Sequence, residues 1–504
     1  MSDPTSTADA AELGGSHGSG ATHVPDPATV AREVFGWAEL RPGQRAAMEA
    51  LVEGRDVLAV MPTGSGKSAL YQVPAVLRDG PTIVVSPLVA LQQDQLAAVS
   101  EVGDGAVQVN ASVGAADRAQ ALASARAADA EFVFVTPEQL ADESVLGTLA
   151  QGRPSLVAVD EAHCVSGWGH DFRPDYLLLG HAIEALGRPP VVALTATAAP
   201  PVRDDIVTLL GLRDPLVVVH GLDRPNIELD VRTFADDRSR RDAVAELVTS
   251  LPSPGLVYVG TRREVDALAD ELTGLGPRAV AGYHAGLPAK RRAQVLEAFM
   301  ADEVEVVVAT NAFGMGIDKH DVRYVLHATT PDSPDAYLQE LGRAGRDGEA
   351  ARAILLHRTE DLALRRFLSG GLPAVERLVT VATAVHEHPA TTRGLLQEQT
   401  GLHRQGLSRA LVLLEHVGGV RRDRRGRVRP GHVAPREAAE RARQQAERHR
   451  ELLRSRIALM RDYVATDRCR RQFLLGAMGE RLERPCGSCD TCRAGSAGHG
   501  ASGD

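Results

Sequence analysis

Short apolar runs constrain the fold of this chain more than any other feature. They recur from Val57 onward as VLAVM, TIVVS, FVFVT, LVAVD and VVALTA, each bounded by Gly, Pro or polar residues. Because their apolar character is continuous rather than alternating, they indicate strands that are buried on both faces. Helix-like stretches separate the runs, which predicts a parallel sheet with crossover helices. None of the runs approaches the ~18 to 20 residues that a membrane span needs.

The same pattern occurs a second time. After a break near residues 221–240 it resumes as GLVYVG, AVAGY, VEVVVAT, VRYVLHAT and ARAILL, so we predict two α/β lobes in tandem. Past about residue 370, amphipathic helical periods replace the strands, and the hairpin-like RRDRRGRVRP follows them. Two short helices with a basic ribbon predict a winged helix-turn-helix.

The net charge of −10 over 504 residues hides an asymmetry. Between Thr391 and Arg493 there are 23 arginines and 12 acidic residues, a net charge of +11, which leaves −21 for the rest of the chain. This basic part can form a phosphate-binding surface. The N-terminus has neither the basic start nor the apolar stretch of a signal peptide, so we expect a soluble, cytoplasmic protein with no membrane partner.

A glycine-rich loop, MPTGSGKSALYQ, follows the strand VLAV and opens a helix, which is the context of a phosphate loop. It departs from the strict pattern because Met61 stands where the first glycine is usual. We expect Lys67, one of three lysines in the chain, to reach the β- and γ-phosphates of ATP, and Ser68 to ligate Mg²⁺. A glycine-rich turn with a chance lysine is the alternative. The predicted nucleotide-binding residues of the loop are Thr63, Gly64, Ser65, Gly66, Lys67 and Ser68.

Two acidic residues, Asp160 and Glu161, follow the buried strand LVAVD in the run DEAH. Ligands of parallel α/β sheets bind at the carboxyl ends of the strands. We therefore expect Asp160 to hold Mg²⁺ and Glu161 to polarise the attacking water. A DEAH run alone also fits a helix start, but its pairing with Lys67 at the same sheet edge favours ATP hydrolysis.

The run DEAHCVSGWGHDFRPDY resembles the Walker B motif and aromatic-rich loop of RecQ-type DNA helicases, within helicase superfamily 2. Other runs that resemble motifs of this family are FGWAELRPGQ, VVSPLVALQQDQL, FVTPEQL, ALTATA, VATNAFGMGIDKHDVRYVLH and DAYLQELGRAGRDG. Together they cover about residues 30–365, and the cysteine-rich end resembles the zinc module of the family. The resemblance implies ATP-dependent DNA unwinding in the 3′ to 5′ direction.

The resemblance also implies roles in the ATP site. In the segment FGWAELRPGQ, which also fits a plain helix start, the residues that would bind adenine are Trp37, Arg41 and Gln44. Arg343 and Arg346 would complete the site from the second lobe, with Arg346 as the arginine finger. The alternative for both residues is an ordinary surface arginine with no role in the ATP site.

Aromatic residues make up 4% of the chain, yet Trp168 and Phe172 lie close together just after the acidic pair. With Arg173 they would stack unpaired bases and report bound DNA to Glu161 and His163, whereas core packing is the alternative. Polar side chains at strand ends would contact the DNA backbone or relay lobe closure, unless they only cap helices. These residues are Ser86, Thr136, Thr195, Thr197, Thr310 and Asn311.

Four of the five cysteines follow the spacing C-x16-C-x2-C-x2-C, at Cys469, Cys486, Cys489 and Cys492. Four thiolates satisfy tetrahedral Zn²⁺ and leave no position for water, which predicts a structural zinc site. For the fifth cysteine, Cys164, we favour a small buried apolar residue.

The predicted fold class is α/β, with two tandem RecA-like lobes of parallel sheets followed by a winged-helix-like segment and a helical zinc-binding module. The expected units are a disordered tail (1–26), the ATP-binding lobe 1 (27–220), lobe 2 (221–368), a winged-helix-like DNA-binding segment (369–432), the zinc module (433–493) and a disordered tail (494–504). In longer family members the winged helix follows the zinc module, whereas here it precedes it. Its ribbon has six arginines and no aromatic residue, which favours backbone contact over a stacked strand-separating wedge, with a solvated loop as the alternative.

The predicted function is therefore DNA unwinding in repair and recombination, with ATP, Mg²⁺ and Zn²⁺ as cofactors. Single-stranded and duplex or forked DNA are the expected partners, single-strand-binding protein is a further candidate, and the expected location is the nucleoid. Two alternatives stay open. One is a DNA-stimulated translocase that does not separate strands, and the other is a winged-helix DNA-binding regulator with the ATPase as a switch.

Overall fold

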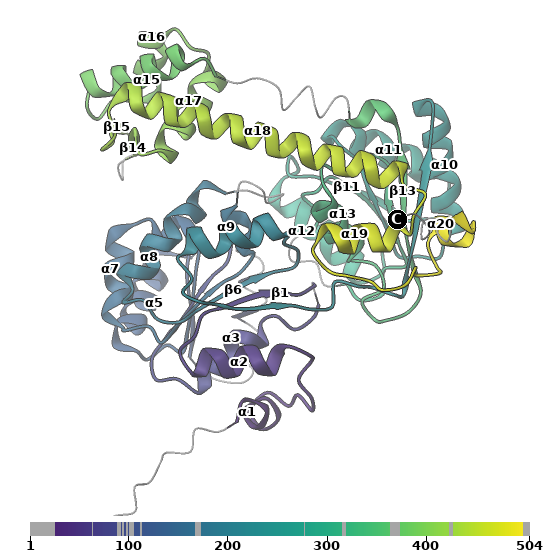
Figure 1. Cartoon of the computed structure of the whole chain (residues 1–504), viewed down its shortest axis with the longest axis horizontal. Helices are drawn as coiled ribbons and strands as arrows, with labels where there is room; N and C mark the ends of the chain where they lie inside the picture. Colours follow the sequence, from purple (N-terminus) through teal and green to yellow (C-terminus); the bar gives the residue numbers. More distant parts are fainter. Residues whose placement is uncertain are drawn as a thin grey trace, which may run out of the picture.

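The computed structural model describes residues 26–496 except 63, 88–91, 93–94, 97–98, 100–104, 111–112, 167–172, 277, 315–318, 363–372 and 423–426. Within these residues the chain forms two parallel sheets and one antiparallel ribbon (Figure 1), which confirms the predicted fold class. Three predicted site residues, Thr63, Trp168 and Phe172, lie outside the described residues, as do the predicted tails apart from residues 26 and 494–496. In the part of the chain described, we find no helix long and apolar enough to cross a membrane.

Lobe 1 is built on a seven-stranded parallel sheet in the order β3-β4-β2-β5-β6-β1-β7. The five apolar runs form its buried centre, as predicted. The two edge strands were not predicted, because both are only partly buried. The strands are β1 (Val57–Val60), β2 (Thr82–Val85), β3 (Ala106–Val109), β4 (Phe132–Val135), β5 (Leu156–Val159), β6 (Val191–Thr195) and β7 (Leu216–Val219). The helices are α1 (Pro27–Glu33), α2 (Gln44–Val52), α3 (Ala69–Val76), α5 (Ala115–Ala127), α6 (Pro137–Leu140), α7 (Glu143–Gln151), η1 (Ala162–Val165), η2 (Pro174–Leu178), α8 (Leu179–Ala185) and α9 (Pro200–Leu210).

Lobe 2 is built on a six-stranded parallel sheet in the order β10-β11-β9-β12-β13-β8. Its edge strand β8 was not predicted, because apolar and polar residues alternate in IELDVRT and the apolar run is broken. The strands are β8 (Ile227–Thr233), β9 (Gly255–Tyr258), β10 (Val280–Tyr283), β11 (Val306–Ala309), β12 (Tyr324–His327) and β13 (Ala351–His357). The helices are α10 (Asp237–Ser250), α11 (Arg262–Gly274), α12 (Ala289–Met300) and α13 (Pro334–Leu341).

The segment predicted as a winged helix contains three helices and the ribbon. These elements are α15 (Val375–Glu387), α16 (Arg393–Thr400), α17 (Arg404–His416), β14 (Val420–Arg422) and β15 (Val428–Pro430). Their core includes Ala438, Ala439 and Ala442 from the long helix α18 (Pro435–Ala465). The core of this segment therefore includes residues of α18, the helix that opens the predicted zinc module.

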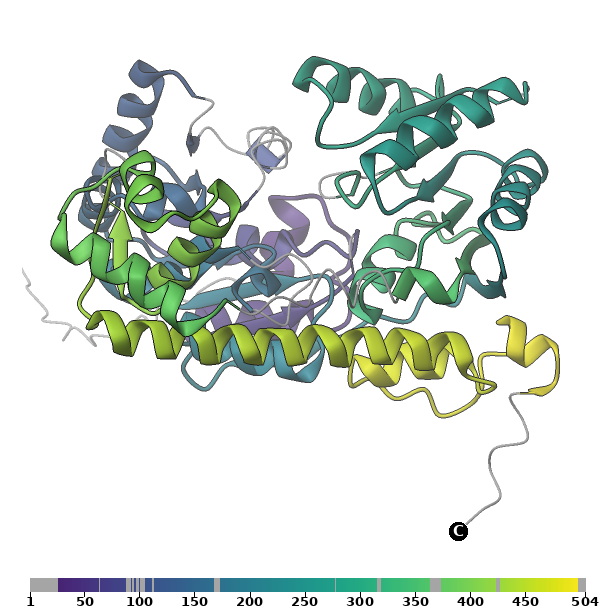
Figure 2. The ribbon, with the colours of Figure 1, turned by 90° about the horizontal axis from the view of Figure 1, so that it is seen from above.

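The zinc module follows at the other end of α18, with α19 (Arg470–Ala477) and α20 (Asp490–Arg493). Figure 2 shows α18 spanning the length between the winged-helix elements, on the lobe 1 side of the molecule, and the zinc module beside lobe 2. Ile457, Met460 and Tyr463 of α18 pack into the lobe 2 core. One helix thus belongs to two cores.

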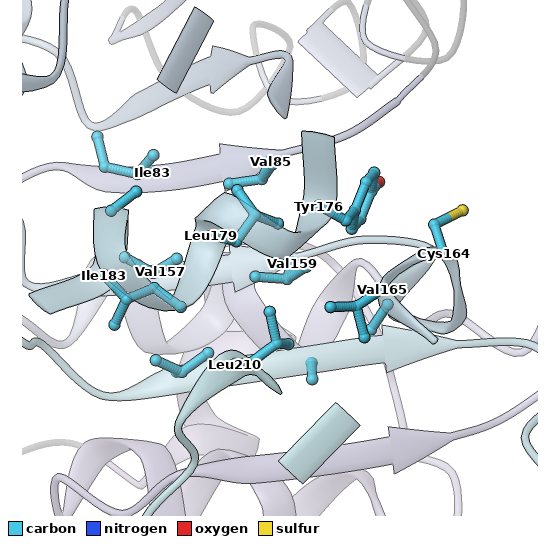
Figure 3. Packing of buried hydrophobic residues seen from close by; sticks show 14 of the residues in the cluster. Ile83, Val85, Val157, Val159, Cys164, Val165, Tyr176, Leu179, Ile183 and Leu210 are labelled. Atoms are coloured by element: carbon cyan, nitrogen blue, oxygen red, sulfur yellow. The ribbon is translucent and has the colours of Figure 1, made fainter. Parts of the chain in front are cut away.

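The core of lobe 1 lies directly behind the acidic motif. Val159 of β5 and Val165 of η1 pack with Tyr176 and Leu179 (Figure 3). Cys164 is fully buried in the same cluster, which confirms its interpretation as a small core residue. The buried apolar side chains hold η1 in place, and with it the residues that precede it.

Candidate ATPase and zinc sites

The glycine-rich loop leaves β1 and turns into α3, as the phosphate-loop interpretation requires. Gly64 and Gly66 both adopt positive φ angles, +77° and +76°, which non-glycine residues rarely reach. The Lys67 ammonium donates to the carbonyls of Met61 at 3.1 Å and Pro62 at 3.3 Å. The loop thus holds the only lysine of lobe 1 inside its own turn, next to the start of a helix.

Asp160 follows the last residue of β5 at the carboxyl edge of the sheet. Burial, together with the charge of Glu161, raises its pKa to about 7, while the nearby Lys67 ammonium opposes both effects. Glu161 has a left-handed backbone with φ 48° and ψ 45°, a conformation that costs about 1 to 3 kcal/mol in a residue other than glycine and is often found at functional sites. The fold therefore brings Lys67 and the two acidic residues together, as the sequence predicted.

His163 connects this edge to the next strand. Its Nδ1 lies 3.3 Å from Glu161 Oε2 and 2.9 Å from Thr195 Oγ1, and the Thr195 hydroxyl donates to the Thr197 carbonyl at 3.0 Å. Burial lowers the pKa of His163 to about 3. A neutral imidazole therefore joins Glu161 to the ALTATA segment at neutral pH.

The predicted adenine residues line a pocket of about 390 Å³ beside the loop. The Gln44 amide donates to the carbonyls of Ser65 and Gly66, at 3.2 and 3.0 Å, and Arg41 Nη1 donates to the Gly64 carbonyl at 2.7 Å. Trp37, which is partly buried, stacks on Phe35 with ring centroids 4.7 Å apart. The pocket thus opens onto both an aromatic ring and the phosphate loop.

Arg346 reaches this site from lobe 2. A Cβ added at Gly64 would lie 3.6 Å from Arg346 Cδ, so the arginine side chain lies directly against the phosphate loop of the other lobe. Arg343 differs, because it is buried and its Nη1 donates to the Gly314 carbonyl within lobe 2. The two arginines that the sequence grouped together therefore have different surroundings.

The four cysteines converge at the end of the chain. Their sulfur atoms all lie within 4.8 Å of one another, and Cys486 and Cys492 Sγ are 3.9 Å apart. Ligands of a Zn²⁺ ion with Zn–S bonds of about 2.3 Å are about 3.8 Å apart in a tetrahedron. Hydrogen bonding from Cys489 lowers the pKa of Cys486 to about 7, and the same interaction raises the pKa of Cys489 to about 11. The residues fit a zinc site with four cysteine ligands.

Known proteins match each part of this arrangement. Residues 41–206 match the DEAD/DEAH box helicase family, residues 239–348 the helicase conserved C-terminal domain and residues 434–493 the RecQ zinc-binding family. The ATP-dependent DNA helicase RecQ of Synechocystis sp. is 34% identical over 92% of this chain and 97% of that protein. The chain belongs to the RecQ family of ATP-dependent DNA helicases.

Other RecQ-family relatives match over shorter parts. The probable ATP-dependent DNA helicase RecS of Bacillus subtilis is 39% identical over 66% of this chain and 67% of the relative, and the chain spans 52% and 61% of the length of two further RecQ helicases. The structure of Mycobacterium smegmatis helicase Lhr bound to ssDNA and AMP-PNP has a TM-score of 0.55 at 22% identity, covering 84% of this chain and 63% of that chain. That likeness supports the fold. The family matches and the RecQ-family relatives confirm the prediction of an ATP-dependent DNA helicase.

The predicted DNA contacts of this RecQ-family chain differ in exposure. Asn311 is exposed and Thr310 partly exposed, whereas Ser86 is fully buried and Thr136 nearly so. Arg173 donates from Nη1 to the Pro87 carbonyl at 3.2 Å, which fixes it at the sheet edge. A DNA contact by Ser86 would require this edge to open, and the DNA roles stay predictions.

Sequence reasoning missed Arg224, which lies in the linker between the lobes. Its guanidinium donates to the carbonyls of Gly342, Ala344 and Gly345, at 3.0, 2.8 and 2.6 Å, so it holds the loop that carries Arg343 and Arg346. All but three of the 56 basic residues are arginines. A single arginine in such a chain gives no signal of its own.

Proposed function

We propose that the chain unwinds duplex DNA by ATP-driven translocation on single-stranded DNA, in the 3′ to 5′ direction, in DNA repair or recombination. The contact of Arg346 with the phosphate loop carries the proposal. It joins the two lobes at the point where the β- and γ-phosphates of ATP would bind, so hydrolysis can be coupled to lobe closure. The relatives named as DNA helicases and the neighbour bound to ssDNA support the choice of substrate.

In this proposal Lys67 turns from its loop carbonyls to the β- and γ-phosphates, and Glu161 accepts a proton from the attacking water. Arg346 stabilises the charge that develops on the transferred phosphoryl group. Asp160 and Ser68 offer the oxygen ligands that Mg²⁺ prefers. They fit this ion, which when bound supplies charge neutralisation at the phosphates.

DNA contact is proposed for two regions. Arg173, Thr136, Thr310 and Asn311 border the sheet edges of the two lobes, where single-stranded DNA would cross. The basic ribbon β14–β15, together with α17, would contact duplex backbone at the other end of α18. The role of Trp168 and Phe172 belongs to the same proposal.

A translocase that does not separate strands is the second candidate, because the ribbon contains no aromatic residue to act as a wedge. Unwinding assays decide between the two. We expect ATP hydrolysis that single-stranded DNA stimulates, and unwinding of duplexes with 3′ tails but not 5′ tails. Stimulated hydrolysis without unwinding of either duplex would favour the translocase, and no stimulation would exclude both. Because the relatives are named as DNA helicases, we also propose that the protein associates with single-strand-binding protein and with the nucleoid.

A further inference from the structure

The long helix α18 makes a buried polar contact with lobe 2 that the proposed mechanism does not use. Arg456 Nη2 donates to Ser333 Oγ and to Asp335 Oδ2, both at 2.9 Å. All three residues are buried, with 7%, 0% and 5% of their surfaces exposed. Buried ion pairs of this kind add little to stability compared with apolar residues of similar size, but removal of one partner leaves an uncompensated buried charge.

The contact lies at the start of helix α13, and the loop that carries Arg346 follows the end of this helix. Ser333 is the N-cap of α13 and accepts from the Ala336 amide, so Arg456 holds both the cap and an acidic residue of the first turn. The next turn is fixed against the same helix, because Tyr337 of α13 packs on Tyr463 of α18 with ring centroids 5.3 Å apart. α18 therefore contacts the N-cap and the first two turns of α13.

The other end of this segment is held from the interlobe linker. Arg224 binds three carbonyls of the loop after α13. The segment that presents Arg346 to the phosphate loop is thus clamped at its start by Arg456 and at its end by Arg224. α18 is also part of the winged-helix core, so the helix that positions α13 also carries the basic ribbon at its far end.

We propose that Arg456 is a positioning residue of the ATPase, which sets the place of Arg346 against the phosphate loop by holding Ser333 and Asp335. The proposal rests on the arginine-finger role proposed above. Misplacing a catalytic group by a fraction of its contact distance lowers turnover much more than it changes nucleotide binding. Loss of Arg456 should therefore lower kcat and leave KM for ATP nearly unchanged.

Arg456→Met, which keeps the aliphatic stem, is the first test. In the full chain with zinc, we expect DNA-stimulated kcat to fall on the order of tenfold, with KM for ATP within about twofold. Arg454→Met is the matched control, because this exposed arginine lies on the same helix, and its kcat should stay unchanged. An unchanged kcat in Arg456→Met, or a change in KM alone, would overturn the proposal.

A second arm separates positioning from general damage. In an Arg346→Lys background, Arg456→Met should add less than about a twofold loss, because the guanidinium fork that Arg456 positions is already lost. The same tenfold loss in both backgrounds would overturn the positioning role. If Arg346→Lys alone leaves kcat unchanged, the arginine-finger assignment fails and the role of Arg456 fails with it.

Arg456→Lys covers the case in which the methionine variant does not fold. Lysine keeps the buried positive charge, but a flexible ammonium replaces the rigid guanidinium whose single nitrogen Nη2 reaches both partners. We expect normal zinc content and melting temperature, with kcat lowered about threefold. Full wild-type kcat in this variant, together with a folded and fully active Asp335→Asn, would contradict the proposal.

Discussion

The zinc site and the ATP site are built in opposite ways. All four zinc ligands lie between Cys469 and Cys492, in one short segment whose spacing sets the geometry. The ATP site runs from Trp37 in lobe 1 to Arg346 in lobe 2, and only the relative position of two sheets brings its parts together. The comparison teaches that loss of one zinc ligand should act through folding of a local module. Loss of one ATP-site residue should change nucleotide binding or turnover and leave the fold intact.

Glu161→Gln should have the largest effect on the ATP side of this comparison. An isosteric amide cannot accept a proton from water, so we expect kcat for ATP hydrolysis to fall about a thousandfold. Nucleotide affinity and zinc content should stay at wild-type values. Glu53→Gln, at an exposed position after α2, is the control. Loss of nucleotide binding in Glu161→Gln would instead make this residue a structural ligand.

Cys489→Ser should disrupt metal binding at the zinc site. Three remaining thiolates cannot close the tetrahedron, so metal per chain should fall from about one towards zero and DNA affinity should fall with it. DNA-independent ATPase activity should fall less than zinc content, because Lys67 and Glu161 lie in lobe 1, whereas Cys489 packs in the core of lobe 2. Cys164→Ala is the control, because it removes a cysteine outside the cluster, and this variant should keep the zinc content of the wild-type protein. Stoichiometric zinc in Cys489→Ser would mean that another ligand completes the site.

Substitution of ribbon arginines should have the smallest effect. Replacing Arg421, Arg422, Arg424 and Arg425 with Ser, the last two of which lie outside the described residues, should weaken duplex binding. The logarithm of the duplex-binding constant falls linearly with the logarithm of salt concentration, and this slope should become less steep by up to about 3.6 if each arginine neutralises one phosphate. The matched controls for lost charge are two α18 arginines, at 436 and 441, that pair with glutamates four residues away. An unchanged slope would favour a solvated loop.

The contrast also explains how much could be predicted from the sequence. Lys67, Asp160, Glu161 and the cysteines were predicted because each belongs to a local motif or to a strand end. The central strands were predicted because they are apolar on both faces. Edge strands such as β8 were missed because one face meets solvent.

Long-range polar contacts could not be predicted at all. Arg224 and Arg456 act through partners more than a hundred residues away in the chain. Nothing in their neighbouring residues distinguishes them from other arginines. Only the packing of lobe 2 against the linker and α18 gives them a role.

The central claim is that Arg346 of lobe 2 completes the ATP site on lobe 1, and its most direct test compares two nucleotide states. ADP with aluminium fluoride mimics the transferred phosphoryl group, whereas ADP alone lacks it. We predict that the wild-type protein binds the mimic at least about a hundredfold more tightly than ADP, as transition-state analogues do. Arg346→Ala should bind ADP with unchanged affinity and lose most of that difference. Retention of the full difference in Arg346→Ala would contradict the account.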